Sequence, residues 1–211
     1  MKLDWKIALG AIIVIVVAGG LAMLFLQPSY SYPEINSPRP FWGNPSASVI
    51  VQEFSDFQCP ACANVFSLVK QLEQEFDQNV RFEFKQYPLT QIHKYAMDAA
   101  LVSECANDQE KFWPYHDLLF NESRSAALQG ATPNFSRENL IAFARKLDLN
   151  AESFTACLYS EAKKNVIEAD IAQGDALRVP GTPTFFVNGV QVSDNSQLKN
   201  MILAALAQTS S

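Results

Sequence analysis

Residues 53–62 read Glu53-Phe54-Ser55-Asp56-Phe57-Gln58-Cys59-Pro60-Ala61-Cys62. A run of strand-forming residues from Val49 to Phe54 ends just before the two cysteines, and residues 64–72, which follow them, have apolar residues at helical spacing. The cysteine pair is therefore predicted at a helix N-terminus, where unpaired N–H groups and the helix dipole favour a negative charge. A thiolate is stabilised there, so its pKa falls and a reversible disulfide is the natural interpretation.

The first residues of the chain indicate where these cysteines act. Residues 7–26 contain no charged residue, and at about 1.5 Å per residue a helix of this length spans roughly 30 Å, the thickness of the hydrocarbon core of a bilayer. Lys2 and Lys6 precede the run, which predicts a cytoplasmic N-terminus. We expect residues 1–27 to be an uncleaved, single-pass anchor in the cytoplasmic membrane, with the catalytic domain on its extracytoplasmic side.

A cleaved signal peptide is the alternative interpretation of this segment, since Ala18 and Gly20 offer a small-x-small cleavage site. Cleavage there would leave Leu-Ala-Met-Leu-Phe-Leu at the new N-terminus, and the apolar run is longer than a usual signal-peptide core. Both interpretations place the cysteines in an oxidising compartment, where disulfides persist.

The rest of the chain has the composition of a spacer followed by one domain. Residues 28–45 contain five prolines among serine and asparagine, which predicts an extended linker. Residues 46–211 are long enough to bury a core of their own. The net charge of −6 and the pI near 4.9 argue against nucleic acid as a partner, because no cluster of Lys and Arg is present to neutralise phosphates.

Hydrophobic periodicity divides the domain into three parts. The first is a βαβ unit: a strand over 48–54, the helix of the cysteines to about Asp77, and an alternating strand over 80–87. The second contains no convincing strand, and helices fit residues 94–106, 111–120, 137–147, 151–159 and 161–177. The third is a hairpin around Asn188-Gly189 and a last helix over about 196–207. The pattern predicts an α/β fold with a helical insertion at about residues 91–178.

A second motif lies far from the cysteines: Val179-Pro180-Gly181-Thr182-Pro183-Thr184. Two prolines around a glycine, directly before a strand, do not fit a regular ladder, and such a proline is a candidate for a cis peptide bond. A cis bond before Pro183 would leave the backbone N–H and C=O of Thr182 free for an extended substrate. A simple trans turn is the alternative.

Other interpretations of a single CxxC pair are weaker. Structural zinc needs a second pair of ligands at similar spacing, and Cys105, Cys157, His93 and His116 do not supply one. Two inert buried cysteines would not explain Pro60, which suits a first helical turn because it lacks an N–H. We expect no metal and no other cofactor.

The motifs together resemble the DsbA family of thioredoxin-fold thiol:disulfide oxidoreductases. They are residues 53–62, the insertion segment 112–120 and the stretch 181–189, and the resemblance covers about residues 46–207. It implies a thioredoxin-like α/β fold with an inserted all-helical subdomain, here preceded by the predicted N-terminal transmembrane helix. It also implies a cis proline at Pro183 and dithiol/disulfide exchange with protein substrates.

The two cysteines are expected to have different roles. Cys59, nearest the helix N-terminus and the surface, is the predicted attacking sulfur, which forms a mixed disulfide with the substrate. Cys62, one turn along and more buried, is expected to resolve that intermediate. Thr182 and Pro183 are expected to pack against the pair and to align the substrate backbone.

Glu53 matches the position of a buried acid in the family, which implies that it passes protons to and from Cys62. A buried carboxylate is costly without a partner, so we expect Lys85 on the neighbouring strand to pair with it. An exposed carboxylate at the end of the strand is the alternative. Cys105 and Cys157 fall in predicted helices of the insertion, and the resemblance implies a structural disulfide between them, with two free buried cysteines as the alternative.

By this resemblance the protein forms disulfides in exported, unfolded proteins and is reoxidised by a quinone-linked membrane thiol oxidase of the DsbB or VKOR type. Strongly oxidising members often carry histidine between the cysteines, where this chain has Ala61, so a milder oxidant is predicted. A disulfide reductase or isomerase would use the same cysteines. A non-catalytic chaperone or metal-delivery protein would use them, or the groove beside Pro183, for binding alone.

Overall fold

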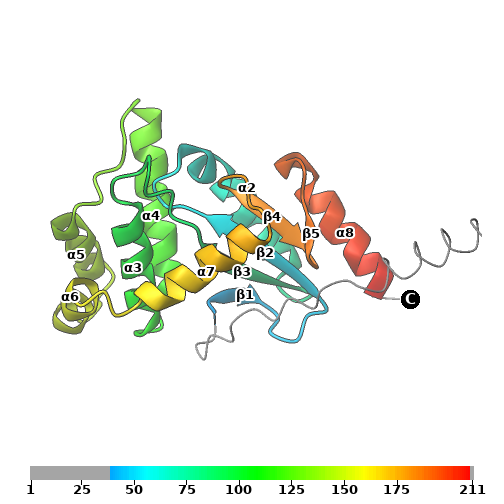
Figure 1. The fold of residues 1–211 in the computed structure, drawn as a ribbon. Coiled ribbons are helices and arrows are strands. Elements are labelled where there is room, and N and C mark those ends of the chain that lie inside the picture. The colour runs from blue at the N-terminus through cyan, green and yellow to red at the C-terminus, as the bar shows by residue number, and fades with distance from the viewer. Residues whose placement is uncertain (1–38, 210–211) are drawn as a thin grey trace, which may run out of the picture. The chain divides into compact units, whose positions relative to one another are not determined.

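The computed structural model describes residues 39–209, whose strands form one five-stranded sheet (Figure 1). The strand order is β1-β3-β2-β4-β5, and the central strands β2 and β3 run parallel. The other three strands each pair antiparallel with a neighbour, β1 with β3, β4 with β2, and β5 with β4. The bounds are β1 (Phe41–Gly43), β2 (Val49–Ser55), β3 (Val80–Gln86), β4 (Thr184–Val187) and β5 (Val190–Gln191).

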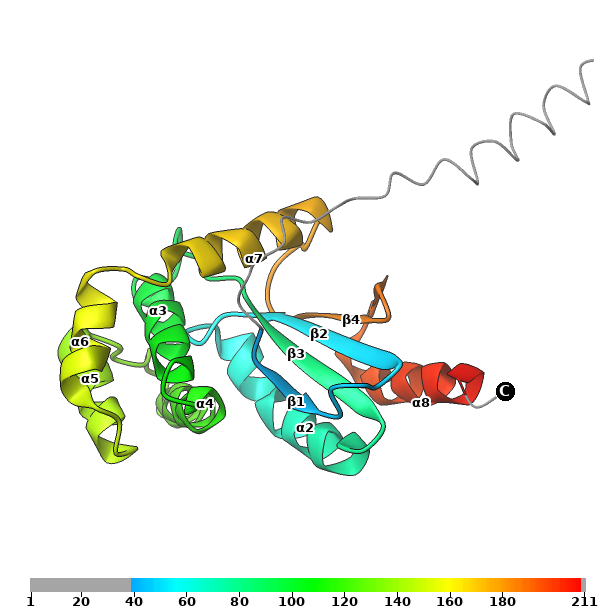
Figure 2. The same ribbon diagram turned by 90° about the horizontal axis from the view of Figure 1, so that it is seen from below.

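Helices cover both faces of this sheet and one of its ends. Figure 2 shows α7 over one face, α2 and α8 over the other, and α3 to α6 gathered beside the sheet. The helices are α2 (Pro60–Phe76), α3 (Ala96–Asn107), α4 (Phe112–Leu128), α5 (Arg137–Lys146), α6 (Ala151–Tyr159), α7 (Lys164–Ala176) and α8 (Leu198–Thr209), with the 3-10 helix η1 (Asn195–Gln197) before α8. The predicted mixed α/β fold is confirmed, although α7 lies on the sheet itself.

The alternation along β2 and β3 decides which side chains each layer buries. Val49 and Val51 contribute to a core with residues of α2 and α8, together with Val80 and Phe82 of β3. Phe54 points to the other face, where Phe186 and Val179 join it in a separate cluster. Glycine at position 174 lets α7 approach that face, because a Cβ there would lie 2.5 Å from the Tyr87 ring.

The first strand was missed by the sequence analysis, which placed residues 41–43 in the proline-rich linker. Phe41 and Trp42 pair with β3, and the Trp113 indole N–H donates to the Phe41 carbonyl at 2.9 Å. Gly43 has φ of +91°, and a Cβ there would lie 2.2 Å from the Val80 carbonyl oxygen. A three-residue edge strand is too short to show an alternating pattern, so no periodicity could reveal it.

None of the helices within residues 39–209 is long and apolar enough to cross a bilayer. The predicted anchor, residues 1–27, and most of the predicted linker lie outside the residues that the structure describes.

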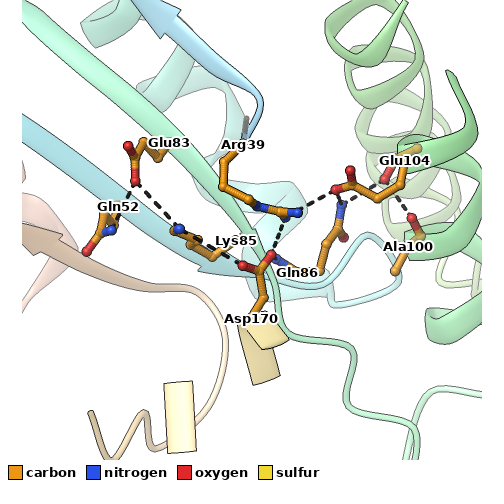
Figure 3. Close-up of polar contacts among 9 residues, drawn as sticks. Arg39, Gln52, Glu83, Lys85, Gln86, Ala100, Glu104 and Asp170 are labelled. Carbon is orange, nitrogen blue, oxygen red and sulfur yellow. Dashed lines mark hydrogen bonds and ion pairs between the residues drawn. The ribbon is translucent and has the colours of Figure 1, made fainter. Parts of the chain in front are cut away.

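A buried charge cluster ties the start of the described chain to three elements (Figure 3). The Arg39 guanidinium lies 3.2 Å from Glu104 of α3 and also contacts Asp170 of α7. The Gln86 backbone N–H donates to Asp170 at 2.8 Å, and its side-chain amide donates to Glu104 at 3.0 Å. The Lys85 ammonium lies 4.0 Å from Asp170. Because the Glu104 and Asp170 side chains are only 3% and 0% exposed, these contacts replace their lost hydration.

Candidate active site

The cysteine pair lies where β2 passes into α2. Cys59 is the N-cap residue of α2, with φ −74° and ψ 122°, and Pro60 takes the first helical position. Cys62 lies in the first turn and is completely buried, whereas Cys59 keeps 6% of its surface exposed. Both cysteines carry free thiols. Only Cys59 can therefore meet a large substrate without rearrangement of the fold.

The environment of the two sulfurs separates their pKa values. The pKa of Cys59 is lowered to about 5, mainly by a hydrogen bond from the Cys62 thiol, although burial opposes this. The Thr182 side chain and the backbone N–H groups of Cys62 and Ala61 lower it further. Burial raises the pKa of Cys62 well above its usual range, and the neighbouring Cys59 adds to this. At neutral pH the pair thus holds one thiolate and one thiol.

The proline motif lies against Cys59. The peptide bond between Thr182 and Pro183 is cis, and the Cys59 sulfur lies 3.4 Å from the Thr182 carbonyl oxygen. The Thr184 hydroxyl donates to the Gly181 carbonyl at 2.7 Å and closes the loop. Pairing of β4 with β2 places this loop next to the start of α2. An open groove of about 490 Å³, lined by Pro180, Pro183, Thr184 and residues 191–195, adjoins it.

Glu53 is a buried acid on the same strand that leads to Cys59. Its side chain lies on the β2 face that packs against α2, and the residue is 8% exposed. Burial raises its pKa to about 8, with hydrogen bonding to Ser55 as an opposing effect and the charge of Glu73 as a further increase. Glu53 can therefore hold a proton at neutral pH and release it in mildly alkaline conditions.

The expected pairing of Glu53 with Lys85 is wrong. In the register of the parallel pair, Glu53 lies opposite Phe84, and Lys85 lies opposite Phe54. Adjacent residues of a strand point to opposite faces, so the Lys85 ammonium reaches Glu83 at 3.6 Å and the α7 residue Asp170 at 4.0 Å instead.

The turn before Cys59 is held by the loop that follows β3. The buried Asp56 carboxylate accepts from the backbone N–H groups of Gln58 and Leu89, at 2.8 and 2.9 Å, and lies 2.7 Å from the His93 ring nitrogen. The Tyr95 N–H donates to the Gln58 side chain at 2.7 Å. Sequence reasoning missed the contacts with this loop because Leu89, His93 and Tyr95 lie more than 30 positions from their partners and share no spacing pattern with them.

Cys105 and Cys157 are joined by a disulfide with an S–S distance of 2.00 Å and a Cα–Cα distance of 5.9 Å. The bond connects α3 with α6 in the helical part of the domain. It leaves Cys59 and Cys62 as the free pair, so the two sets of cysteines have separate chemistry.

Titration of the reduced protein tests the thiolate. We expect the Cys59 thiol to ionise near pH 5, as followed by the absorbance of the thiolate at 240 nm. Cys59→Ser should remove this transition, whereas Cys62→Ser should keep a single titrating thiol. Because the folded pKa lies below the ordinary value of 9.0, the thiolate stabilises the reduced form at alkaline pH, and this contribution is lost as the pH falls from about 9 to about 5. A midpoint near the ordinary thiol value would contradict this geometry.

Three features define the class of thiol–disulfide oxidoreductases with a thioredoxin fold. They are a low-pKa cysteine at a helix N-terminus, a buried thiol one turn further, and a cis-proline loop that contacts the first cysteine. The sequence profile of the family described as Thioredoxin matches residues 36–204, and the chain belongs to this family. The protein is thus an enzyme of disulfide exchange.

Solved structures with the same fold include proteins of this class. A thioredoxin-like oxidoreductase from Silicibacter pomeroyi is 26% identical, with a TM-score of 0.68 over 81% of this chain and 94% of its own. BdbD from Bacillus subtilis is 25% identical, with a TM-score of 0.67 over 80% and 93%. Alpha-DsbA1 from Wolbachia pipientis, at 19% identity and a TM-score of 0.68 over 84% and 97%, shares the fold.

The curated relatives are much longer proteins. The Na(+)/H(+) antiporter NhaA 1 of Salinispora arenicola is 38% identical over 173 residues, which are 82% of this chain and 24% of the antiporter. The Na(+)/H(+) antiporter NhaA of Herminiimonas arsenicoxydans is 35% identical over 79% of this chain and 24% of its own length. The chain thus spans about a quarter of the length of these relatives.

Proposed function

We propose that this enzyme is an oxidase that forms disulfide bonds in exported proteins. The observation that carries the proposal is the unequal pair, in which the pKa of Cys59 falls to about 5 while that of Cys62 rises. A stable thiolate favours the reduced form, and a couple whose reduced form is favoured is a stronger oxidant of other thiols. Release of Cys59 as a good leaving group also speeds the transfer of the disulfide to the substrate.

The reaction proceeds by two thiol–disulfide exchanges. A substrate thiolate attacks Cys59 in the Cys59–Cys62 disulfide, which forms a substrate–Cys59 bond, breaks the internal bond and releases Cys62 as a thiolate that takes up a proton. A second substrate thiolate then attacks the substrate sulfur of this mixed disulfide and displaces Cys59 as a thiolate. Two electrons pass from the substrate to the enzyme, and Glu53 is the buried acid placed to exchange the proton of Cys62.

The cis-proline loop is the proposed docking site for the substrate backbone. The Cys59 sulfur lies beside the Thr182 carbonyl, so a substrate cysteine bonded to Cys59 brings its own backbone alongside this residue. The adjoining groove along Pro180, Pro183 and residues 191–195 can accept the side chains that flank the cysteine. Backbone contacts of this kind suit unfolded clients, because they read an extended chain without selecting one sequence.

The enzyme needs an acceptor for the two electrons it gains, and we propose a quinone-linked membrane thiol oxidase of the DsbB or VKOR type. The predicted anchor, residues 1–27, would hold the domain close to such a partner on the extracytoplasmic side of the cytoplasmic membrane. The curated relatives support a place at the membrane, because the matching segment occurs within proteins named as Na(+)/H(+) antiporters.

The reduction potential of the Cys59–Cys62 couple tests the direction of the reaction. We expect a value well above the roughly −270 mV of thioredoxin and below the roughly −120 mV of DsbA, because Ala61 supplies no charge to the thiolate. The measurement is equilibration with defined ratios of reduced and oxidised glutathione. A potential near that of thioredoxin would favour a reductase and contradict the proposed oxidase.

Ala61 offers a direct way to change this potential. Its position on α2 is exposed, so histidine fits there, and a positive charge beside Cys59 lowers the thiol pKa further. We expect Ala61→His to raise the potential by about 30 mV for each pKa unit, measured in the same glutathione buffers. Ala61→Gln adds a side chain of similar size without a charge and is expected to leave the potential nearly unchanged. Equal potentials for all three proteins would contradict the electrostatic explanation.

A further inference from the structure

Glu53 can serve Cys62 repeatedly only if its own proton exchanges with solvent, and it is buried. We propose that Ser55 and Glu73 complete a proton route, in which the Ser55 hydroxyl connects Cys62 with Glu53, and a cavity connects Glu53 with Glu73 and its surface partner Lys70. This inference rests on the proposed exchange function and adds two residues to it.

The inner part of the route is the Ser55 hydroxyl. Ser55 follows Glu53 by two positions on β2, so both side chains point to the face covered by α2, and Ser55 is 1% exposed. Its oxygen has no hydrogen bond of regular geometry within residues 39–209. Burial raises the pKa of both Glu53 and Cys62, and the nearby Ser55 hydroxyl opposes this rise in both, so it lies within reach of each side chain. A hydroxyl that both donates and accepts can pass a proton between them.

The middle part of the route is a small cavity between the sheet and α2. Glu53 and Glu73 both line it, with Glu83 and otherwise mainly apolar side chains around them. Its volume is about 10 Å³, close to the minimum that one water molecule needs, and the carboxyl groups supply polar partners for such a water. The two acids therefore share one space that is closed to large molecules.

The outer part of the route is the ion pair of Glu73. The Lys70 ammonium lies 2.8 Å from the Glu73 carboxylate and 3.2 Å from Asp117 of α4, and the Lys70 side chain is 22% exposed. Asp117 in turn lies 2.9 Å from the ring of the buried His116. Glu73 itself is 1% exposed, so its contact with solvent passes through these neighbours.

The charges that face Glu73 put the two acids in different states. They are Lys70 on α2, Asp117 and His116 on α4, and Glu53 across the cavity. Glu83 also lines the cavity, but its carboxylate pairs with Arg81 and Lys85 on the other face of the sheet. Burial raises the pKa of Glu73 to about 6, while Lys70 opposes this, and burial raises that of Glu53 to about 8. Near neutral pH, Glu53 is thus mainly protonated beside an ionised Glu73, which is the arrangement of a proton donor next to an acceptor.

The same groups supply the proton to Cys62 in one half-reaction and remove it in the other. When the substrate releases Cys62 as a thiolate, Ser55 gives it a proton and takes one from Glu53. Glu53 regains its proton from solvent, by way of the Glu73 carboxylate, which takes up and passes on one proton through the cavity. When Cys62 attacks a mixed disulfide during reoxidation, its proton leaves by the same groups in the opposite order, and no electron moves along the route.

The test follows the resolving step alone. Cys59 is converted to its mixed disulfide with glutathione, and the release of glutathione by Cys62 is measured between about pH 5 and pH 9. We expect Glu73→Gln to move the midpoint of this profile down, by at most about one pH unit, because burial still raises the pKa of Glu53 but the added effect of the Glu73 charge is lost. Ser55→Ala is expected to slow release about tenfold or more across the range.

Two further variants make the test specific. Glu75→Gln changes the same charge on α2 at an exposed residue paired with Lys199, and Glu73→Asp keeps the charge, so both are expected to keep the wild-type midpoint. A Glu73→Gln profile that superimposes on the wild type, or a wild-type rate in Ser55→Ala, would overturn the route. A wild-type protein that does not release glutathione at any pH would instead overturn the proposed function.

Discussion

Cys59→Ser is expected to reduce disulfide transfer to the uncatalysed rate, a loss of about a thousandfold or more. The serine oxygen cannot form the mixed disulfide, and the second sulfur, Cys62, is completely buried with a raised pKa. No other free cysteine is present among residues 39–209 to replace it. The measurement is the oxidative refolding of a reduced, unfolded protein, with glutathione disulfide as the terminal oxidant.

Cys62→Ser is the matched control for this loss. It keeps Cys59, the sulfur nearer the surface, so it should still form the mixed disulfide but should not resolve it. A covalent substrate complex should then accumulate and be visible on a non-reducing gel. Retained binding of clients by Cys59→Ser without turnover would agree with an enzyme whose groove is intact. Unchanged turnover in Cys59→Ser would contradict the exchange mechanism and favour a non-catalytic binding protein.

The parts of this site that depend on local signals could be predicted from the sequence. The strand, the cysteine pair and the helix follow one another without interruption, so a period of two changing to a period of 3.6 was enough to place Cys59 at a helix start. The hairpin at Asn188-Gly189 is equally local, and both residues have positive φ values, 47° and 79°, as a tight two-residue turn requires.

Glu73 was missed although the sequence carries a signal for it. Cys62, Phe66, Val69 and Phe76 form the buried stripe of α2, and Glu73 occupies the position between Val69 and Phe76 in the same stripe. A carboxylate at such a position must be paired or protonated. The error with Lys85 had a related origin, because the pairing register of two strands is needed before opposite residues can be named.

Contacts between distant segments could not be predicted in this way. Arg39 and Asp170 are separated by 131 positions, and His93 and Asp56 by 37, and neither pair belongs to a repeating pattern. These contacts arise only when the sheet brings α7 and the loop after β3 into place. Periodicity predicts which face of an element is buried, but it does not predict which buried polar groups meet.

Arg39→Met is expected to destabilise the folded domain by about 3–5 kcal/mol at pH 7.5. The methionine has a similar length but leaves the buried carboxylates of Glu104 and Asp170 without their guanidinium partner. Such a loss is a large fraction of the stability of an ordinary domain. The measurement is urea-induced unfolding followed by tryptophan fluorescence or circular dichroism.

The pH dependence of this loss distinguishes the charge cluster from simple packing. Burial raises the pKa of Asp170 to about 6, above its ordinary value of 3.8, although the charges of Arg39 and Lys85 oppose this. Protonation of Asp170 therefore stabilises the folded domain at acidic pH, and this contribution is lost as the pH rises through about 6. Above that pH the buried Asp170 carboxylate depends on the charge of Arg39. We expect a distinctly smaller loss at pH 5 than at pH 7.5. Arg137→Met, at a partly exposed arginine that pairs with Asp98, should cost under about 1 kcal/mol at both pH values. An equal loss for Arg39→Met at both pH values, or one as small as that of Arg137→Met, would show that the cluster does not act through its charges.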